Sequence, residues 1–220
     1  MKAIIFDMDG VLCDSERLTA EAARRMFAER HGVRVTEADF RPFIGSGEDR
    51  YLGGVAAARG VALNLPADKD RMYAIYLEII PGRLPALPGA IPFVAAARAA
   101  GLRLAVATSA DRVKMDGNLL AIGLSEASFD ACVTGTEILR KKPDPDIFLT
   151  AARRLGLPNG DCLVVEDAPN GVRAAAAAGS PCLALTSTFA ESELRAAGAR
   201  WIAPDLARVP EDLRRRLGLE

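Results

Sequence analysis

The fold is decided by residues 1–16, MKAIIFDMDGVLCDSE. A short apolar run begins at Ala3 and ends at Asp7, and Asp9 and Gly10 follow it directly. A run that is apolar on both faces is typical of a strand buried inside a parallel sheet. Side chains two residues apart on an extended chain point the same way, so Asp7 and Asp9 can reach one site. Gly10 then permits a tight turn.

Four more apolar runs end at polar residues in the same manner. They are Leu102 to Ser109, Ala131 to Gly135, Cys162 to Asp167 and Pro181 to Ser187. The intervening stretches predict helices at residues 89–100, 145–155 and 169–178, each of which is followed by a glycine. This alternation predicts an α/β fold with a doubly wound parallel sheet, a Rossmann-like core.

Residues 14–83 interrupt the alternation and contain no convincing strand. Their pattern predicts about four helices, the second of them beginning after Thr36, which can cap it with Asp39 at the third helical position. We therefore expect a helical cap domain, residues 14–83, inserted into a core domain formed by residues 1–13 and 84–220. The segment after Ser187 either adds a short edge strand near Trp201 or packs as helix.

The composition limits the classes of function. Lysine and arginine number 28 against 29 acidic residues, so no nucleic-acid tract or polybasic membrane patch is expected. No apolar stretch reaches the roughly 18 residues that a membrane span needs. The opening apolar run is too short for a signal peptide. The four cysteines form no CxxC pair, so we expect buried free thiols and a reducing cytoplasm.

Polar groups follow the other predicted strands at the same edge of the sheet. Thr108 and Ser109 end the second strand, and Glu166 and Asp167 end the fourth. Lys142 stands immediately before a helix that a proline initiates. Carboxylates suit Mg²⁺, and a lysine can neutralise phosphoryl oxygens. Together with the first acidic pair, these residues predict a site for a metal ion and a phosphate.

Four motifs carry a family resemblance over essentially the whole chain. They are DMDGVLCDS (residues 7–15), the hydroxyl pair Thr108-Ser109, KPDPDIF (residues 142–148) and VVEDAPNG (residues 164–171). The chain resembles the haloacid dehalogenase-like hydrolase superfamily, and its helical insert is similar to the small cap of the β-phosphoglucomutase-like and phosphatase branch. The resemblance implies a phosphoric monoester hydrolase acting on a small phosphorylated metabolite.

The resemblance also implies a mechanism. Asp7 would attack phosphorus and form an aspartyl-phosphate. Asp9 would protonate the leaving alcohol and then deprotonate the hydrolytic water. Thr108 would hydrogen-bond the transferring phosphoryl group, helped by the backbone N–H of Ser109. Lys142 would neutralise both the nucleophile and the phosphate.

By the same resemblance, Mg²⁺ is the cofactor. It would be held by Asp7, by the backbone carbonyl of Asp9 and by Asp167, with Glu166 acting directly or through water. The cap loop FIGSGED, residues 43–49, would reach the substrate through Gly45 and Ser46.

Several departures from the family pattern favour a phosphatase over a sugar-phosphate mutase. Thr19 replaces a histidine that several members carry, and Glu48 stands where the mutases place a cap arginine. A cap lysine has no counterpart near Met72. Asp9 argues against a dehalogenase, which has no alcohol to protonate. A non-catalytic binding module is disfavoured because the acidic pairs and Lys142 are all present. The sequence does not indicate an oligomeric state.

Overall fold

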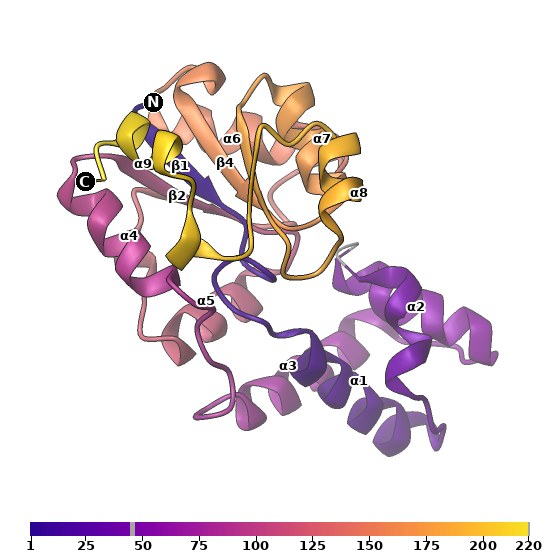
Figure 1. The fold of residues 1–220 in the computed structure, drawn as a ribbon. Helices are drawn as coiled ribbons and strands as arrows, with labels where there is room; N and C mark the ends of the chain where they lie inside the picture. The colour runs from indigo at the N-terminus through magenta and orange to yellow at the C-terminus, as the bar shows by residue number, and fades with distance from the viewer. Residues whose placement is uncertain (45–46, 220) are drawn as a thin grey trace.

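The computed structural model describes residues 1–44 and 47–219, and a six-stranded parallel sheet forms its centre (Figure 1). The strands are β1 (Ala3–Phe6), β2 (Arg103–Ala107), β3 (Ala131–Val133), β4 (Cys162–Glu166), β5 (Cys182–Leu185) and β6 (Trp201–Ala203). Their order is β3-β2-β1-β4-β5-β6, and every pairing is parallel. The predicted doubly wound α/β fold is confirmed, and after Ser187 the chain forms both the edge strand near Trp201 and short helices.

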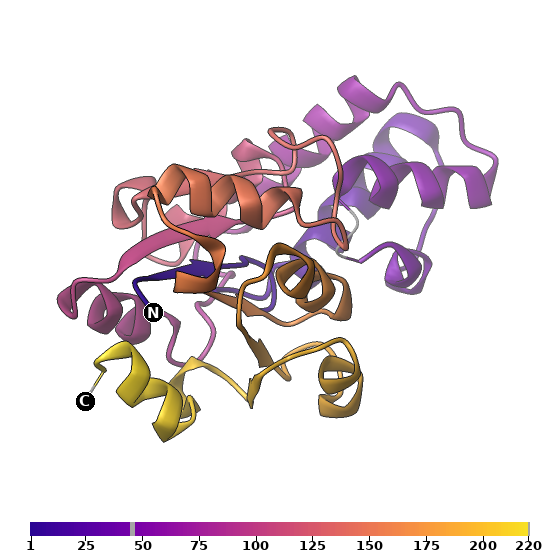
Figure 2. The same ribbon diagram turned by 90° about the horizontal axis from the view of Figure 1, so that it is seen from above.

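Helices cover both faces of the sheet, as its apolar strands require. The helices on one face are α4 (Ala90–Ala99), α5 (Arg112–Ala121) and α9 (Glu211–Leu217), and those on the other are α6 (Asp146–Leu155), α7 (Pro169–Ala178) and α8 (Glu191–Ala196). Along β1, Ile4 and Phe6 are buried against the first group, whereas Ala3 and Ile5 are buried against the second. Figure 2 shows helices on both sides of the sheet.

The insert between β1 and β2 is helical. It contains α1 (Glu16–His31), α2 (Glu48–Arg59) and α3 (Leu65–Ile79), and both α1 and α2 pack against α3. Figure 1 shows these three helices grouped beside the α/β part. Within residues 1–44 and 47–219, none of the helices combines the length and the apolar character that crossing a bilayer requires.

The prediction of a helix beginning after Thr36 was wrong. That segment forms two short 3₁₀ turns, Glu37–Asp39 and Arg41–Phe43. The carboxylate of Asp39 accepts hydrogen bonds from the backbone N–H and the hydroxyl of Thr36, and the first of these is the Asp39 half of a capping box. Pro42 has no N–H to continue a helical ladder, so the turn ends instead of extending.

The chain leaves and re-enters the α/β part along two adjacent segments. Cys13 and Ala86 form an antiparallel bridge, and the backbone N–H of Leu87 donates to the carbonyl of Leu12 at 2.9 Å. The insert is therefore attached at one place rather than at two separated points.

The position of β1 determines where a ligand can bind. The chain passes from β1 to β2 on one side and later to β4 on the other, so strand order reverses at β1. In open parallel sheets, ligands bind beyond the carboxyl ends of the strands at this switch point. The residues that follow β1, β2 and β4 are therefore the ones to consider.

Candidate active site

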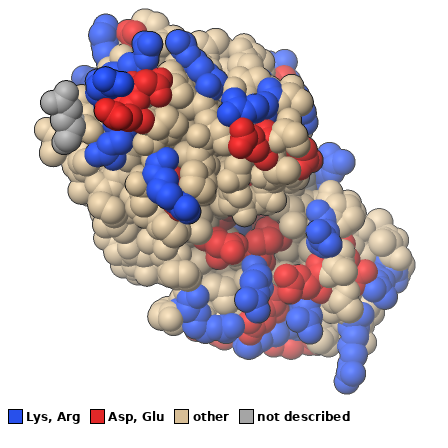
Figure 3. All heavy atoms as spheres, in the orientation of Figure 1, with Lys and Arg blue, Asp and Glu red and all other residues tan. Residues whose placement is uncertain are grey.

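The predicted site residues meet at the switch point. A cavity of about 260 Å³ opens there, and it lies between the α/β part and the insert. Its lining includes Asp7, Asp9, Thr108, Ser109, Lys142, Glu166 and Asp167. Two other predicted contact residues, Gly45 and Ser46, lie outside the described residues. Figure 3 shows acidic side chains gathered around a hollow between these two parts of the molecule.

Lys142 joins the carboxylates that follow two neighbouring strands. Its Nζ donates to Oδ1 of Asp7 and to Oε1 of Glu166, both at 2.6 Å. Its side chain is only 6% exposed. Burial alone would lower the pKa of Lys142, but the two carboxylates outweigh that effect and raise it above its ordinary value. Lys142 is therefore an ammonium held against Asp7.

Asp7 is buried among like charges. Desolvation, opposed by Lys142 and reinforced by Glu166, raises the pKa of Asp7 to about 7. Desolvation, together with the charges of Glu166 and Asp7, also raises the pKa of Asp167 well above its ordinary value. One ammonium does not balance three carboxylates, so this site carries excess negative charge that a further cation would neutralise.

The same three carboxylates fit a divalent metal ion. Oxygens of Asp7, Glu166 and Asp167 lie within 4.8 Å of one another. All are hard oxygen donors, the type that Mg²⁺ prefers. A Cβ on Gly10 would lie 2.0 Å from Oδ2 of Asp167, and one on Gly171 would lie 1.7 Å from Oε1 of Glu166. Glycine at these two positions leaves room for the carboxylates.

Glu166 has little free hydrogen-bonding capacity. Its Oε1 accepts from Lys142, and its Oε2 accepts from the backbone N–H groups of Asp167 at 2.9 Å and Ala168 at 3.0 Å. These bonds fix the orientation of the side chain at the end of β4.

Thr108 and Ser109 line the cavity at the end of β2. Thr108 is buried, and its Oγ1 accepts from the backbone N–H of Ala110 at 3.2 Å. Its hydroxyl hydrogen therefore remains available to a ligand oxygen. Ser109 is partly exposed and precedes α5.

The Asp9 carboxylate is held from the side of α5. Its Oδ2 accepts from Nζ of Lys114 at 2.9 Å, and its Oδ1 accepts from Ser15 and from Nδ2 of Asn118 at 3.5 Å. Asn118 in turn accepts a hydrogen bond from the hydroxyl of Tyr76 in α3 at 2.5 Å. Asp9 is thus connected to the insert as well as to the sheet.

Lys114 and Asn118 are site residues that the sequence analysis missed, because it considered only the residues that end the strands. The sequence did contain an indication of them, because Lys114 and Asn118 stand four positions apart and each precedes an apolar residue, Met115 or Leu119. In the structure all four residues are buried. Polar residues repeated on a core-facing helical stripe indicate a buried polar network.

The insert contributes the carboxylates of Asp14, Glu16 and Glu48 to the cavity lining. Oε1 of Glu48 lies 3.4 Å from Nζ of Lys114, and Glu16 accepts a hydrogen bond from the hydroxyl of Tyr51 at 2.9 Å. Desolvation raises the pKa of Glu16 to about 7, partly offset by Lys114, and raises that of Glu48 in the same way. Thr19 also lines the cavity, but its hydroxyl donates to the backbone carbonyl of Ser15 at 3.0 Å.

Fold and site together define a class: an α/β enzyme with a carboxylate-rich centre, able to fit a metal ion, at the switch point of a parallel sheet. Comparison with known proteins gives the family. The model of the haloacid dehalogenase-like hydrolases matches residues 1–179. The chain belongs to this family.

Similarities to individual proteins agree with this family assignment. The chain is 46% identical over 212 residues to Protein SUPPRESSOR OF QUENCHING 1, chloroplastic, from Arabidopsis thaliana, covering 95% of this chain but only 20% of that protein. It is 36% identical over 182 residues to the phosphorylated carbohydrates phosphatase of Thermotoga maritima, covering 81% and 82% of the two chains. The crystal structure of CbbY from Rhodobacter sphaeroides in complex with phosphate superposes with a TM-score of 0.82 at 28% identity, covering 94% and 95%.

These findings confirm the resemblance that the motifs indicated and the expected class, a phosphoric monoester hydrolase. Phosphatases of this family generally use Mg²⁺, and named phosphatases among the relatives act on phosphorylated small molecules.

Proposed function

We propose that the chain is a Mg²⁺-dependent phosphatase that hydrolyses sugar phosphates and related small phosphomonoesters through an aspartyl-phosphate on Asp7. The observation that carries this proposal is the contact of Lys142 with both Asp7 and Glu166, beside Asp167, at the switch point. The name of the Thermotoga maritima relative supports a carbohydrate phosphate as the substrate.

In the first step, an oxygen of Asp7 attacks phosphorus and the bond to the leaving oxygen breaks. Lys142 reduces the repulsion between the anionic nucleophile and the anionic ester, because its ammonium lies 2.6 Å from the attacking carboxylate. Thr108 donates its hydroxyl to a phosphoryl oxygen, and the backbone N–H of Ser109 adds a second donor.

Asp9 transfers a proton in each of the two steps. In its protonated form it donates to the leaving oxygen, and as a carboxylate it then takes a proton from the water that attacks the aspartyl-phosphate. Its hydrogen bonds to Ser15, Lys114 and Asn118 hold the carboxylate in the cavity, which supports this role.

Asp7, Asp167 and the backbone carbonyl of Asp9 would hold the Mg²⁺ ion. Glu166 would act through water, since both of its oxygens already accept hydrogen bonds. When bound, the ion supplies positive charge that offsets the repulsion between nucleophile and substrate.

Residues 14–83 act in this proposal as a cap domain that closes over the leaving group, with Gly45 and Ser46 in its contact loop. Glu48 and Glu16 come from the insert and line the same cavity, which supports this role. A cytoplasmic setting, as expected from the sequence, completes the proposal.

The test is Mg²⁺-dependent release of phosphate from p-nitrophenyl phosphate and from glucose 6-phosphate. We expect turnover by the wild-type chain, none after chelation with EDTA, and a loss of at least 1,000-fold, as an order of magnitude, for Asp7→Asn. An Asp7→Asn variant as active as the wild type would refute the nucleophile. Conversion of glucose 1-phosphate into glucose 6-phosphate without free phosphate would instead establish a mutase.

A further inference from the structure

Glu48 is a buried carboxylate that the catalytic steps above do not use. It is the first residue of α2, its side chain is 5% exposed, and it lines the cavity. Its Oε1 faces Lys114, whereas its Oε2 has no hydrogen-bond partner among residues 1–44 and 47–219. Leaving a buried acceptor unsatisfied is costly, so this oxygen indicates a donor supplied by a ligand.

Lys114 places Glu48 next to the leaving group. Its Nζ lies 2.9 Å from Oδ2 of Asp9 and 3.4 Å from Oε1 of Glu48, so the two carboxylates contact the same ammonium. Asp9 serves the ester oxygen in the proposed mechanism. A substrate whose ester oxygen lies at Asp9 therefore extends its next few carbons toward Glu48.

The charges around Glu48 select the chemical group that it can receive. A substrate ammonium would be repelled by Lys114, which is buried and charged. A second phosphate would meet the carboxylates of Glu48, Glu16 and Asp14, which line the same cavity. A neutral hydroxyl donates to a carboxylate without either conflict.

We infer that Glu48 is a specificity-determining residue whose Oε2 accepts a hydrogen bond from a hydroxyl of a polyhydroxylated leaving group. Lys114 is the positioning residue that contacts both Glu48 and Asp9. This inference rests on the proposed phosphatase function and identifies the part of the substrate that Glu48 recognises, a hydroxyl group of the leaving alcohol.

The experiment compares two substrates that differ only in hydroxyl groups. Sorbitol 6-phosphate and n-hexyl phosphate have leaving groups of equal carbon number, and phosphate release gives kcat/KM for each. We expect the wild-type chain to favour sorbitol 6-phosphate. Glu48→Gln lowers the ratio of the two kcat/KM values by about tenfold, because a charge-assisted hydrogen bond becomes a weaker neutral one.

Two further variants make the result specific. Glu48→Asp keeps the charge beside Lys114 but withdraws the oxygens by one methylene, and it is also expected to lower the ratio. Glu37→Gln makes the same change of charge at an exposed position of the insert and is expected to leave the ratio as it is in the wild type.

The outcomes distinguish a failure of this inference from a failure of the proposed phosphatase function. A wild-type ratio near one overturns the assignment of Glu48, as does a wild-type ratio retained by either Glu48 variant. Failure of the wild-type chain to hydrolyse both phosphates in the presence of Mg²⁺ overturns the proposed phosphatase itself.

Discussion

Lys142 is the residue on which the charge balance of the site depends. Replacing it by methionine leaves Asp7 and Glu166 buried without their shared ammonium, and breaking a buried pair costs about 3–5 kcal/mol. Added Mg²⁺ would supply part of the missing charge. We therefore predict that Mg²⁺ raises the thermal midpoint of Lys142→Met by more than it raises that of the wild type.

Differential scanning fluorimetry with and without Mg²⁺ measures this difference. The matched control is Lys141→Met, whose Nζ contacts backbone carbonyl oxygens, that of Gly135 at 2.6 Å among them, and no carboxylate among the described residues. It should respond to Mg²⁺ as the wild type does. Equal Mg²⁺ responses in all three proteins would show that Lys142 does not compete with a metal ion for these carboxylates.

Glu16 gives a prediction about pH. Its pKa rises from an ordinary 4.5 to about 7 on folding, chiefly through desolvation. Between these values the unfolded chain releases this proton while the folded chain keeps it, so the Glu16 contribution to the free energy of unfolding falls as pH rises from about 4.5 to 7. Above pH 7 both states are ionised and the penalty is constant, at most about 3 kcal/mol.

Glu16→Gln removes this contribution. The variant should therefore gain stability relative to the wild type on going from pH 4.5 to pH 8. Urea unfolding of both proteins at the two pH values gives the change with pH in the stability difference between them. Loss of the hydrogen bond from Tyr51 affects the variant at both pH values, so to a first approximation it cancels in this comparison. The same stability difference at both pH values would mean that Glu16 titrates normally in the folded chain.

Single residues of the site could be predicted from sequence where a strand end placed them. Asp7, Thr108 and Asp167 each follow a strand directly, so local pattern and sheet topology were enough to bring them together. Lys114 and Glu48 could not be paired in this way. Their contact depends on how the insert packs against α5, and no local pattern encodes that packing.

At the scale of the elements, α7 is built to accommodate the acidic pair at the end of β4. Gly171 lies in its first turn, and a Cβ there would lie 1.7 Å from the oxygen of Glu166 that binds Lys142. Gly171→Ala should therefore displace Glu166. We predict a loss of about 1–3 kcal/mol in the free energy of unfolding and a weaker apparent affinity for Mg²⁺.

Gly53→Ala is the comparison for this change. Gly53 is also helical, in α2, but a Cβ there would meet nothing within 4 Å. This substitution should stabilise the protein by about 0.5–1 kcal/mol, because alanine loses less conformational entropy in a helix than glycine does. Chemical denaturation of both variants, with Mg²⁺ titrations, checks the pair. Two alanine variants of equal stability would contradict the close contact between α7 and Glu166.

The elements themselves were predictable to different degrees. The five strands with apolar runs on both faces were expected within two residues of their observed ends, and Gly156 and Gly179 end α6 and α7 in the left-handed conformation, as expected. The bounds of α5 were not predicted, since its apolar stripe is interrupted by Lys114 and Asn118. Thr36 suggested a longer helix than Pro42 allows.

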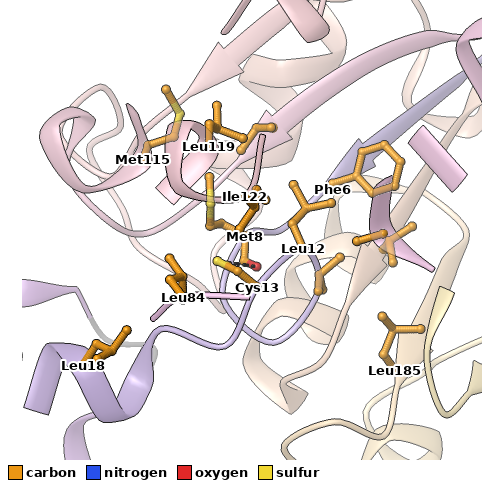
Figure 4. Close-up of a cluster of buried hydrophobic side chains, with 14 of the residues drawn as sticks. Phe6, Met8, Leu12, Cys13, Leu18, Leu84, Met115, Leu119, Ile122 and Leu185 are labelled. Carbon is orange, nitrogen blue, oxygen red and sulfur yellow. Dashed lines mark hydrogen bonds between the residues drawn. The ribbon is translucent and has the colours of Figure 1, made fainter. Parts of the chain in front are cut away.

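At the scale of the whole molecule, the insert and the sheet share one hydrophobic core. The cluster that contains Phe6 and Val106 of the sheet also contains Met26 and Tyr76 of the insert. Figure 4 shows part of this cluster, with residues of α5 beside the two segments that connect the insert. Polar contacts cross the same boundary, among them the ion pair between Lys69 of α3 and Asp111 before α5 at 2.8 Å.

A continuous core predicts that the insert and the α/β part unfold together. The chain carries natural probes for this test, because its single tryptophan, Trp201, lies in β6. Its three tyrosines, Tyr51, Tyr73 and Tyr76, all lie in α2 or α3. Urea unfolding followed by tryptophan fluorescence and by near-ultraviolet circular dichroism of tyrosine should give coincident transitions, since a shared core makes partial unfolding expose apolar surface on both sides. A tyrosine transition at lower urea would show that the insert unfolds on its own, and that the contacts of Tyr76 and Lys69 across the boundary do not couple it to the sheet.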